Sequence, residues 1–392
     1  MEEVSARHSQ RKPGLIDLFA CFLGMGISAF GGPAMIAYLY KKSVDGKKWI
    51  DDETFQDGVA LCQAIPGATA MQMAAYIGLK ARGAPGAMAC YVGFGSPAFL
   101  LMLALSSAYA RTHALPAVVS IFSGLQAVIV AVVAHATLSF GRSSLGSRRK
   151  GAIALFAAGL FWLRAGPVFI ILLAALLGML LNGREAPARG VRRPDPMSHE
   201  TLPLLCLLLF AAAGLLLLFA FRKELFQLAV IMSGIDLMAF GGGFVSLPLM
   251  FHQVVEVRSW MDAPTFLNGI VLGQFTPGPI VITATFVGYM AYGLAGALTA
   301  TIAIFLPSFL MLVGVAPWFD RVRSLPWFSR AVGGILCSFA GLLFTVTVRF
   351  AMEVPWDWRR LAFGSAAFVA LSLRLDLLWV VLAASVISVF AF

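Results

Sequence analysis

The chain has 392 residues, of which 60% are hydrophobic and 12% charged, and its mean hydropathy is +0.87. Soluble domains carry about 25% charged residues, so this composition excludes an ordinary soluble protein and predicts an all-α polytopic membrane protein. The net charge is +10, but most Lys and Arg lie in short segments between apolar runs, as they do in loops of membrane proteins. Nucleic acid is therefore not expected as a partner.

The chain begins with a polar, basic stretch, residues 1–14, which lacks the apolar core and small-residue cleavage site of a signal peptide. We therefore expect a cytoplasmic N-terminus. Apolar runs follow, and a membrane span needs about 20 residues. We predict about 13 membrane segments, at 15–40, 57–79, 84–110, 114–140, 151–163, 166–182, 202–221, 225–250, 266–292, 294–318, 331–350, 361–373 and 377–392. The short members, within 151–182 and 361–392, are either tilted spans or half-membrane hairpins.

One long polar stretch, 182–200, is rich in Pro, Gly and charge, as linkers are. It predicts a first half at 1–182, a linker at 183–201 and a second half at 202–392 that opens with an extra helix. The sequence contains no ATP-binding loop, dinucleotide-binding motif or metal-ligand cluster. We therefore expect no cofactor, no metal and no enzymatic activity.

The second half repeats the first, since residues 30–100 align with 240–310 after two single-residue gaps. The matched residues are Gly, Pro, Gln, Trp and Asp, which chance apolar similarity does not align. The most telling pairs are Phe30 with Phe240, Trp49 with Trp260, Gln63 with Gln274, Pro66 with Pro277, and Gly83 with Gly293. Seven segments precede the second copy, and an odd number inverts it. Inverted repeats with interrupted helices are typical of secondary transporters, whose site lies near the midplane.

Each copy interrupts its helices twice. The first break is FGGP (30–33) or FGGG (240–243), and the second is CQAIPGATAMQ (62–72) or GQFTPGPIVIT (273–283). Unwound backbone at membrane depth occurs where it is buried in protein or lines a cavity. A half-helix that begins there offers free N–H groups and the positive end of a dipole to an anion. The alternative is that the breaks are kinks and close-packing points.

Neutral donors lie beside the breaks, and such a site suits a tetrahedral oxyanion that must later be released. The candidate donors are Ser28, Gln63, Thr69 and Gln72 in the first copy, and Ser246, Gln274, Thr276, Thr283 and Thr285 in the second. Two repeated pairs have a structural interpretation instead. Asp51 and Asp262 are expected to cap helices, and Trp49 and Trp260 fit an interfacial aromatic belt.

Asp236 lies within an apolar run, one helical turn before the second FGG break. An ionisable residue inside the membrane is a functional candidate by default, and proton coupling is its obvious role. The alternative is a carboxylate paired with a neighbouring Arg or Ser.

Taken together, FGGPAMIAYLYKKSVDGKKWIDDETFQDGVALCQAIPG and FGGGFVSLPLMFHQVVEVRSWMDAPTFLNGIVLGQFTPGPIVITATFVGY resemble the chromate ion transporter family in its long, two-domain form. The resemblance covers essentially residues 15–390 apart from the linker. It implies a multi-pass protein of the bacterial or archaeal inner (plasma) membrane, with two homologous domains in opposite orientations. It also implies chromate export driven by the proton motive force, with chromate treated as a mimic of sulfate.

The resemblance further implies which positions bind substrate: Gly31, Gly32, Pro33, Gln63, Pro66, Gly67, Gly241, Gly242, Gly243, Gln274, Pro277, Gly278 and Pro279. The expected partners are thus a chromate-like or sulfate-like oxyanion, protons as coupling ion, and the lipid bilayer, with a homodimer left open. Two alternatives remain at this point. The protein transports sulfate or another tetrahedral oxyanion, or it is a membrane-embedded enzyme or scaffold.

Overall fold

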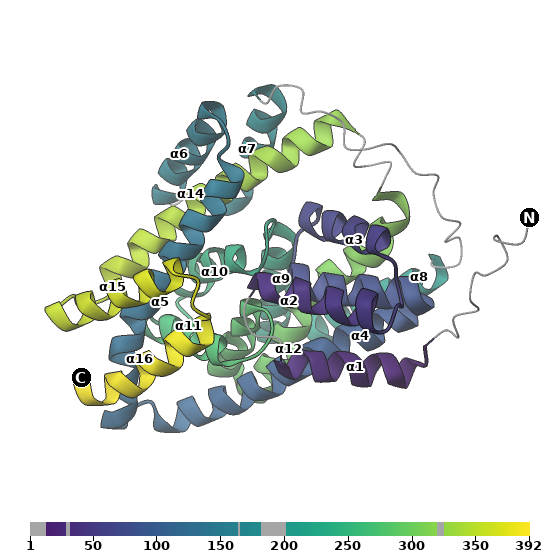
Figure 1. Ribbon diagram of the computed structural model, residues 1–392. Coiled ribbons are helices and arrows are strands. Elements are labelled where there is room, and N and C mark those ends of the chain that lie inside the picture. Colours follow the sequence, from purple (N-terminus) through teal and green to yellow (C-terminus); the bar gives the residue numbers. More distant parts are fainter. Residues whose placement is uncertain (1–12, 29–31, 164, 182–200, 320–324) are drawn as a thin grey trace, which may run out of the picture.

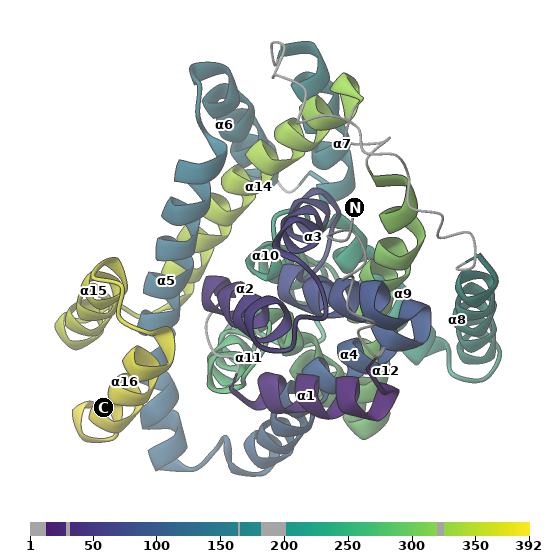
Figure 2. The same cartoon turned by 45° about the vertical axis from the view of Figure 1, so that its right-hand side comes forward.

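A computed structural model of the chain describes residues 13–28, 32–163, 165–181, 201–319 and 325–392. The described part is helical, and no strand occurs within it. Figures 1 and 2 show two long helices, α5 and α14, crossing on one side of the helices that flank the breaks.

The first repeat runs from α1 to α7. Its helices follow the expected apolar segments, with a turn of π-helix, η1, after α2. The elements are α1 (Leu15–Ser28), α2 (Gly32–Tyr40), η1 (Lys41–Gly46), α3 (Asp52–Ala64), α4 (Thr69–Thr112), α5 (Pro116–Ser144), α6 (Arg148–Trp162) and α7 (Pro167–Leu181). The expected linker at 183–201 lies outside the described residues except for Thr201, where α8 (Thr201–Phe221) begins.

The second repeat follows α8 and has the same order of elements. It comprises α9 (Lys223–Met238), α10 (Gly243–Phe251), η2 (His252–Val257), α11 (Ala263–Phe275), η3 (Ile280–Ile282), α12 (Thr283–Val315), η4 (Ala316–Trp318), α14 (Pro326–Glu353), α15 (Trp358–Ser372) and α16 (Leu377–Ala391). Helix α4 contains the end of the expected segment 57–79 and all of the expected segment 84–110. Its backbone bends at Gly83, where φ is +66°, and then continues as a helix. Helix α12 bends in the same way at Gly293, where φ is +61°.

Matching backbone conformations confirm the repeat. Lys48 and Ser259, both just after the π-helical turns, have left-handed φ values of 52° and 51°. Asp51 accepts a hydrogen bond from the N–H of Thr54 (2.7 Å) and Asp262 from that of Thr265 (2.9 Å), so the predicted N-caps are confirmed. The residues at which the helices begin also change one residue pair in the alignment of the two repeats. Gly32 and Gly243 each begin a nine-residue helix, so the extra residue of the second copy lies before Gly243.

Helices α5 and α14 run antiparallel and show how the repeats are related. Their N-caps, Leu115 and Leu325, match in conformation. The hydroxyl groups of Thr137 and Thr347, 210 residues apart, lie 2.9 Å from each other, and Cys337 Sγ lies 3.9 Å from the carbonyl of Ser144. Moving forward along α5 therefore moves backward along α14. Equivalent helices that run in opposite directions are related by an axis perpendicular to them, as inverted repeats require.

The short helix pairs are hairpins that pack across the repeats. Helices α6 and α7 lie beside α14, and α15 and α16 lie beside α5 (Figure 2). Gly178 of α7 sits against the backbone of α14 at Gly334. In the equivalent contact, Gly124 of α5, which corresponds to Gly334, sits against Ser388 of α16, which corresponds to Gly178. Each of these four hairpin helices has 15 residues. Such a helix is about 22 Å long, shorter than the roughly 30 Å hydrocarbon core.

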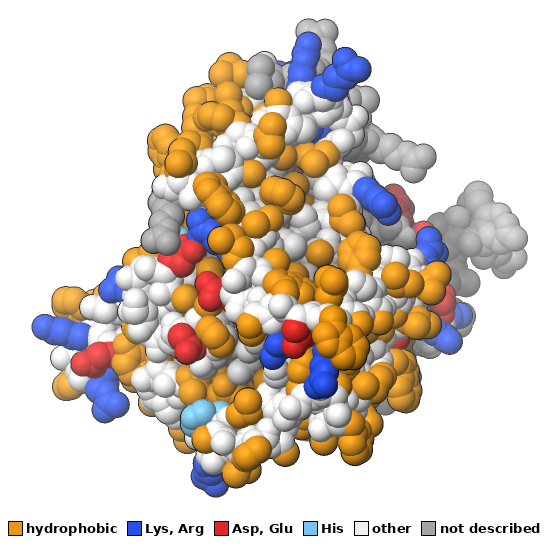
Figure 3. Space-filling model, turned by 90° about the vertical axis from the view of Figure 1, so that its left-hand side faces the viewer, with side chains coloured by type: hydrophobic (Ala, Val, Ile, Leu, Met, Phe, Trp, Pro, Cys, Tyr) orange, Lys and Arg blue, Asp and Glu red, His pale blue; other side chains and the backbone are white. Residues whose placement is uncertain are grey.

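The outer surface is apolar over broad areas, as a lipid-facing surface is. Five described helical stretches are long and apolar enough to cross a membrane: Thr69–Thr112, Pro116–Ser144, Leu202–Phe221, Ile280–Trp318 and Trp327–Glu353. Helix α8 is exposed almost all round, with Leu209 and Phe210 among its exposed side chains. Figure 3 shows hydrophobic side chains spread over one face, with Lys and Arg mainly at its margins.

Candidate functional site

The second break of the first repeat separates α3 from α4. Helix α3 ends at Ala64 because Ile65 takes an extended conformation, and Gly67 has φ +120°, which a residue with a side chain rarely adopts. Helix α4 then begins at Thr69, and its N-cap residue Ala68 makes no side-chain hydrogen bond. The first N–H groups of α4 therefore have neither an intrahelical partner nor a side-chain cap.

Both breaks of the second repeat lie within the described residues. Helix α9 ends at Met238, Gly241 and Gly242 have φ +93° and +106°, and α10 begins at Gly243 without a side-chain cap. The other break has Gly278 at φ +99°, and the 3₁₀ turn η3 follows Pro279. Three residues of 3₁₀ helix rise about 6 Å, as four residues of α-helix do. The turn η3 thus spans the same distance with one residue fewer, which accounts for the residue that the second copy lacks at this break.

The three described breaks, from both repeats, meet at one place. The N–H of Gly67 donates to the carbonyl of Ala239 at 3.0 Å. A Cβ atom at Gly242 would lie 3.8 Å from Oγ1 of Thr69, and one at Gly243 would lie 3.0 Å from a methyl carbon of Val281. The fourth break is only partly visible, since Gly31 lies outside the described residues while Gly32 and Pro33 open α2.

The repeats exchange equivalent contacts at these breaks. A Cβ atom at Gly67 would collide with Ser308 of α12, and one at Gly278 would lie 3.2 Å from Ala98 of α4. Ala98 and Ser308 follow Pro97 and Pro307, the prolines inside the second parts of α4 and α12. Each Pro-Gly break therefore faces the proline interruption of the other repeat.

The glutamines beside the breaks differ in their surroundings. Gln63 is exposed, whereas its repeat partner Gln274 is only 8% exposed and its Nε2 has no hydrogen-bond partner. Gln72 is fully buried, its Nε2 donates to the carbonyl of Pro66 at 2.6 Å, and its Oε1 is unpaired. An unpaired buried polar atom costs about 1–3 kcal/mol, so both amides call for a ligand or a water.

The hydroxyl groups that were candidate donors mostly have backbone partners. Thr276 donates to Gly273 at 2.8 Å and Thr283 to Ile280 at 2.8 Å. Ser246 donates to Gly243 at 2.5 Å, Ser28 lies 3.2 Å from the carbonyl of Gly24, and Thr285 pairs with Thr301 at 2.7 Å. A hydroxyl has one proton to donate. Among the described candidates, the side chains with no donor engaged at the breaks are therefore Gln63, Gln274 and Thr69, beside the backbone N–H groups.

Asp236 binds the proline interruption of α12. Pro307 has no N–H, which leaves the carbonyl of Ala303 without its helical partner. Ser233 donates to that carbonyl at 3.1 Å, and Asp236, which is 1% exposed, accepts from the N–H of Ser308 at 2.7 Å. Sequence reasoning placed Asp236 near the FGGG break of the second repeat but missed Ser233 and Ser308. The repeated prolines were the available signal.

Two polar networks hold elements of the second repeat, one joining η2 to α14 and the other joining α11 to α5 and α4 of the first repeat. Arg349 of α14 forms an ion pair with Glu256, which also contacts His252 at 2.7 Å. Asn268 of α11 accepts from Gln126 of α5 and donates to Tyr109 of α4, each at 3.0 Å. These residues were not candidates from the sequence.

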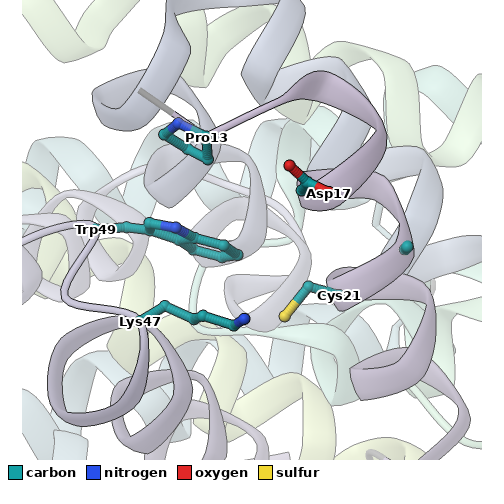
Figure 4. A pocket seen from close by; sticks show the side chains of 6 residues that line it. Pro13, Asp17, Cys21, Lys47 and Trp49 are labelled. Atoms are coloured by element: carbon teal, nitrogen blue, oxygen red, sulfur yellow. The ribbon is translucent and has the colours of Figure 1, made fainter. Parts of the chain in front are cut away.

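A separate cleft of about 530 Å³ opens between α1 and the segment after η1. Pro13, Asp17, Ala20, Cys21, Lys47 and Trp49 line it, and none of them belongs to a break. Figure 4 shows Lys47 and Cys21 pointing toward one another below the ring of Trp49. We therefore place the candidate site at the breaks and not in this cleft.

The apolar exterior, the inverted repeats and the interrupted helices that meet at one place define a polytopic membrane protein with the architecture of a secondary transporter. The sequence model described as "Chromate transporter" matches residues 16–179 and 226–389, once in each repeat. The chain belongs to the chromate transporter family. Membership supports a role in chromate transport, implies an oxyanion substrate, and agrees with a multi-pass protein of the plasma membrane.

Known relatives extend over most of the chain. An uncharacterized transporter of Methanocaldococcus jannaschii is 39% identical over 97% of this chain and 96% of its own length. A chromate transport protein of Cupriavidus metallidurans is 30% identical over 87% of this chain and 84% of its own. One of Pseudomonas aeruginosa is 30% identical over 90% and 85%. No solved structure matches the chain.

Proposed function

We propose that the protein is a secondary active exporter of chromate, driven by the proton motive force, and that it binds the anion where the breaks of the two repeats meet. One observation carries the proposal. Breaks from both repeats are in contact through Gly67 and Ala239, and the buried Gln274 beside them has an unpaired N–H donor. A conformational change that moves one repeat against the other would therefore act directly on the site.

The donors at this place suit an anion that must be released. The uncapped N-termini of α4 and α10 offer N–H groups and partial positive charge. The proposed binding set retains all the candidates: Ser28, Gly31, Gly32, Pro33, Gln63, Pro66, Gly67, Thr69, Gln72, Gly241, Gly242, Gly243, Gln274, Thr276, Pro277, Gly278, Pro279 and Thr283. Within it, Gln63, Thr69 and Gln274 have donors available in this conformation.

The unequal exposure of Gln63 and Gln274 supports alternating access. Helix α11, which carries Gln274, is tied to α5 and α4 through Asn268. In the first repeat, the equivalent helix α3 leaves Gln63 exposed. The transport cycle exchanges these environments, so that Gln274 becomes accessible when Gln63 is covered.

Asp236 is the proposed proton-coupling residue. Its carboxylate holds Ser308, and Ser308 packs against Gly67 of the opposite repeat. Protonation removes the negative charge from this acceptor and weakens the bond. Proton binding would thereby loosen the contact between the Pro-Gly break and α12.

Everted membrane vesicles test the function. Energised vesicles that contain the protein should accumulate radiolabelled chromate, and an uncoupler should abolish the accumulation. Vesicles without the protein are the control. Accumulation no greater than in the control would exclude the proposed function, provided that the protein is present and folded. Reporter fusions at the N-terminus test its proposed cytoplasmic location in the same cells.

Sulfate is the second candidate substrate. Backbone N–H groups and amides recognise the charge and tetrahedral shape of an oxyanion and not its central atom. Sulfate accumulation without chromate accumulation in the same vesicles would favour this alternative.

A further inference from the structure

Gln72 lies on the first full turn of α4, directly above the Pro66–Gly67 break. Side chains of a helix lean toward its N-terminus, and the Gln72 amide follows this rule. Its Nε2 donates to the Pro66 carbonyl at 2.6 Å, and a Cβ atom at Gly67 would lie 2.8 Å from Nε2. The amide group is thus held beside the uncapped start of α4.

The Pro66 carbonyl also determines which way the amide faces. Oxygen and nitrogen of a glutamine amide are assigned from their hydrogen-bond partners. A reversed amide would place Oε1 against the Pro66 carbonyl oxygen, two acceptors with no proton between them. The atom left without a partner is therefore Oε1, an acceptor, and the side chain is fully buried.

The first-repeat break thus offers two kinds of partner side by side. The N–H groups that begin α4 are donors, and Gln72 Oε1 is an acceptor. A tetrahedral dianion has acceptors only, so one of its oxygens would face Oε1 without a hydrogen bond. An oxyanion that retains one proton satisfies both, because its hydroxyl donates to Oε1 while its other oxygens accept from N–H groups.

We propose that the first-repeat break binds the oxyanion in its singly protonated form, with the hydroxyl of the anion donating to Gln72 Oε1. This inference rests on the proposed function. Its consequence is that the transported species has a single negative charge and carries one proton outward, opposite in direction to the inward coupling proton that Asp236 binds. The second-repeat break is complementary, since Gln274 presents an unpaired donor that fits an unprotonated oxygen.

The test is chromate exchange across proteoliposomes with the same pH on both sides and no membrane potential. The KM for total chromate is measured at pH values that span the second ionisation of chromic acid. We expect KM to rise about tenfold per pH unit above that ionisation, while KM expressed as hydrogen chromate stays constant. A KM for total chromate that does not change with pH would overturn the inference and leave the transport function intact.

The variant Asp236→Asn separates titration of the ligand from titration of the protein, because it removes the buried carboxyl group that could otherwise cause the pH effect. A constant KM for hydrogen chromate in that variant supports the inference, and a lost pH dependence overturns it.

Substitution of Gln72 provides the matched variant. Gln72→Met keeps the length of the side chain but removes the acceptor, so the preference for the protonated anion should be lost and KM for total chromate should become less dependent on pH. Gln56→Met makes the same chemical change on the exposed face of α3 and should retain the wild-type profile. An unchanged profile in a folded Gln72→Met protein would contradict the assignment.

Discussion

Thr137 of α5 and Thr347 of α14 occupy equivalent positions in the two repeats, and their hydroxyl oxygens lie 2.9 Å apart. A residue that touches its own symmetry mate lies on the two-fold axis. Each hydroxyl also lies 2.7 Å from a carbonyl one turn earlier, Val133 or Leu343. The axis therefore passes through the crossing of the two long helices. Gly241 of a break packs against Phe140, one turn further along α5.

This contact predicts a cross-link between the two halves. In a chain without its five native cysteines, Thr137→Cys together with Thr347→Cys should form a disulfide under mild oxidation. Cleavage in the linker should then leave the halves joined on a denaturing gel. Leu138→Cys with Thr347→Cys is the control, because Leu138 is exposed and points elsewhere. Equal cross-linking of both pairs would contradict the position of the axis.

Removal of the Gln274 amide should weaken chromate binding. A hydrogen bond to a charged group is worth about 1.5–3 kcal/mol, so Gln274→Leu should raise the KM of exchange by roughly 10- to 100-fold. Gln56→Leu, on the exposed face of α3, should leave KM unchanged. Initial rates in proteoliposomes give both values. A wild-type KM in Gln274→Leu would remove this residue from the site.

The break glycines should be sensitive to a single methyl group. Gly67→Ala and Gly278→Ala place a side chain at φ values of +120° and +99°, which costs about 1 kcal/mol or more. Gly67→Ala should lower the melting temperature further, because its new Cβ atom meets Ser308. Gly159→Ala in α6 meets no atom within 4 Å and should be at least as stable as wild type. Thermal unfolding in detergent measures all three, and equal melting temperatures would refute the argument.

Asp236→Asn should separate binding from coupling. Asparagine retains an oxygen that accepts from the Ser308 N–H, so chromate exchange should continue near the wild-type rate. It cannot take up the coupling proton, so accumulation driven by the proton motive force should be lost. Ser233→Ala removes the other contact with the Pro307 interruption without removing a titratable group and should keep coupled accumulation. Coupled accumulation by Asp236→Asn would assign the proton to another group.

Much of the fold follows from local signals in the sequence. Glycine, proline and capping aspartates act within a few residues, so the repeat, the breaks and the caps at Asp51 and Asp262 could be predicted. The partners of the site residues could not. Asp236 binds the N–H of a residue 72 positions away, and Tyr91 donates to a carbonyl 214 positions away. Such contacts depend on how helices pack within one repeat and between the two, which no local pattern encodes.

The same limit applies to the glutamines. Sequence reasoning treated Gln63 and Gln274 as equivalent donors, whereas packing around α11 buries one and leaves the other exposed. It also treated Gln72 as a donor, whereas the Pro66 carbonyl accepts one N–H of its Nε2 and its Oε1 is left as an unpaired acceptor. The residue type indicates a polar site, but the neighbouring carbonyl decides what that site can bind.

Location of the bound anion tests the central claim most directly. An experimental structure with chromate, whose chromium is identified by its anomalous scattering, would place the anion without reference to transport assays. We predict a chromium site whose oxygens lie within hydrogen-bond distance of the α4 N-terminus or of Gln274 Nε2. A chromium site away from all the breaks, for example in the cleft lined by Lys47 and Trp49, would contradict the account.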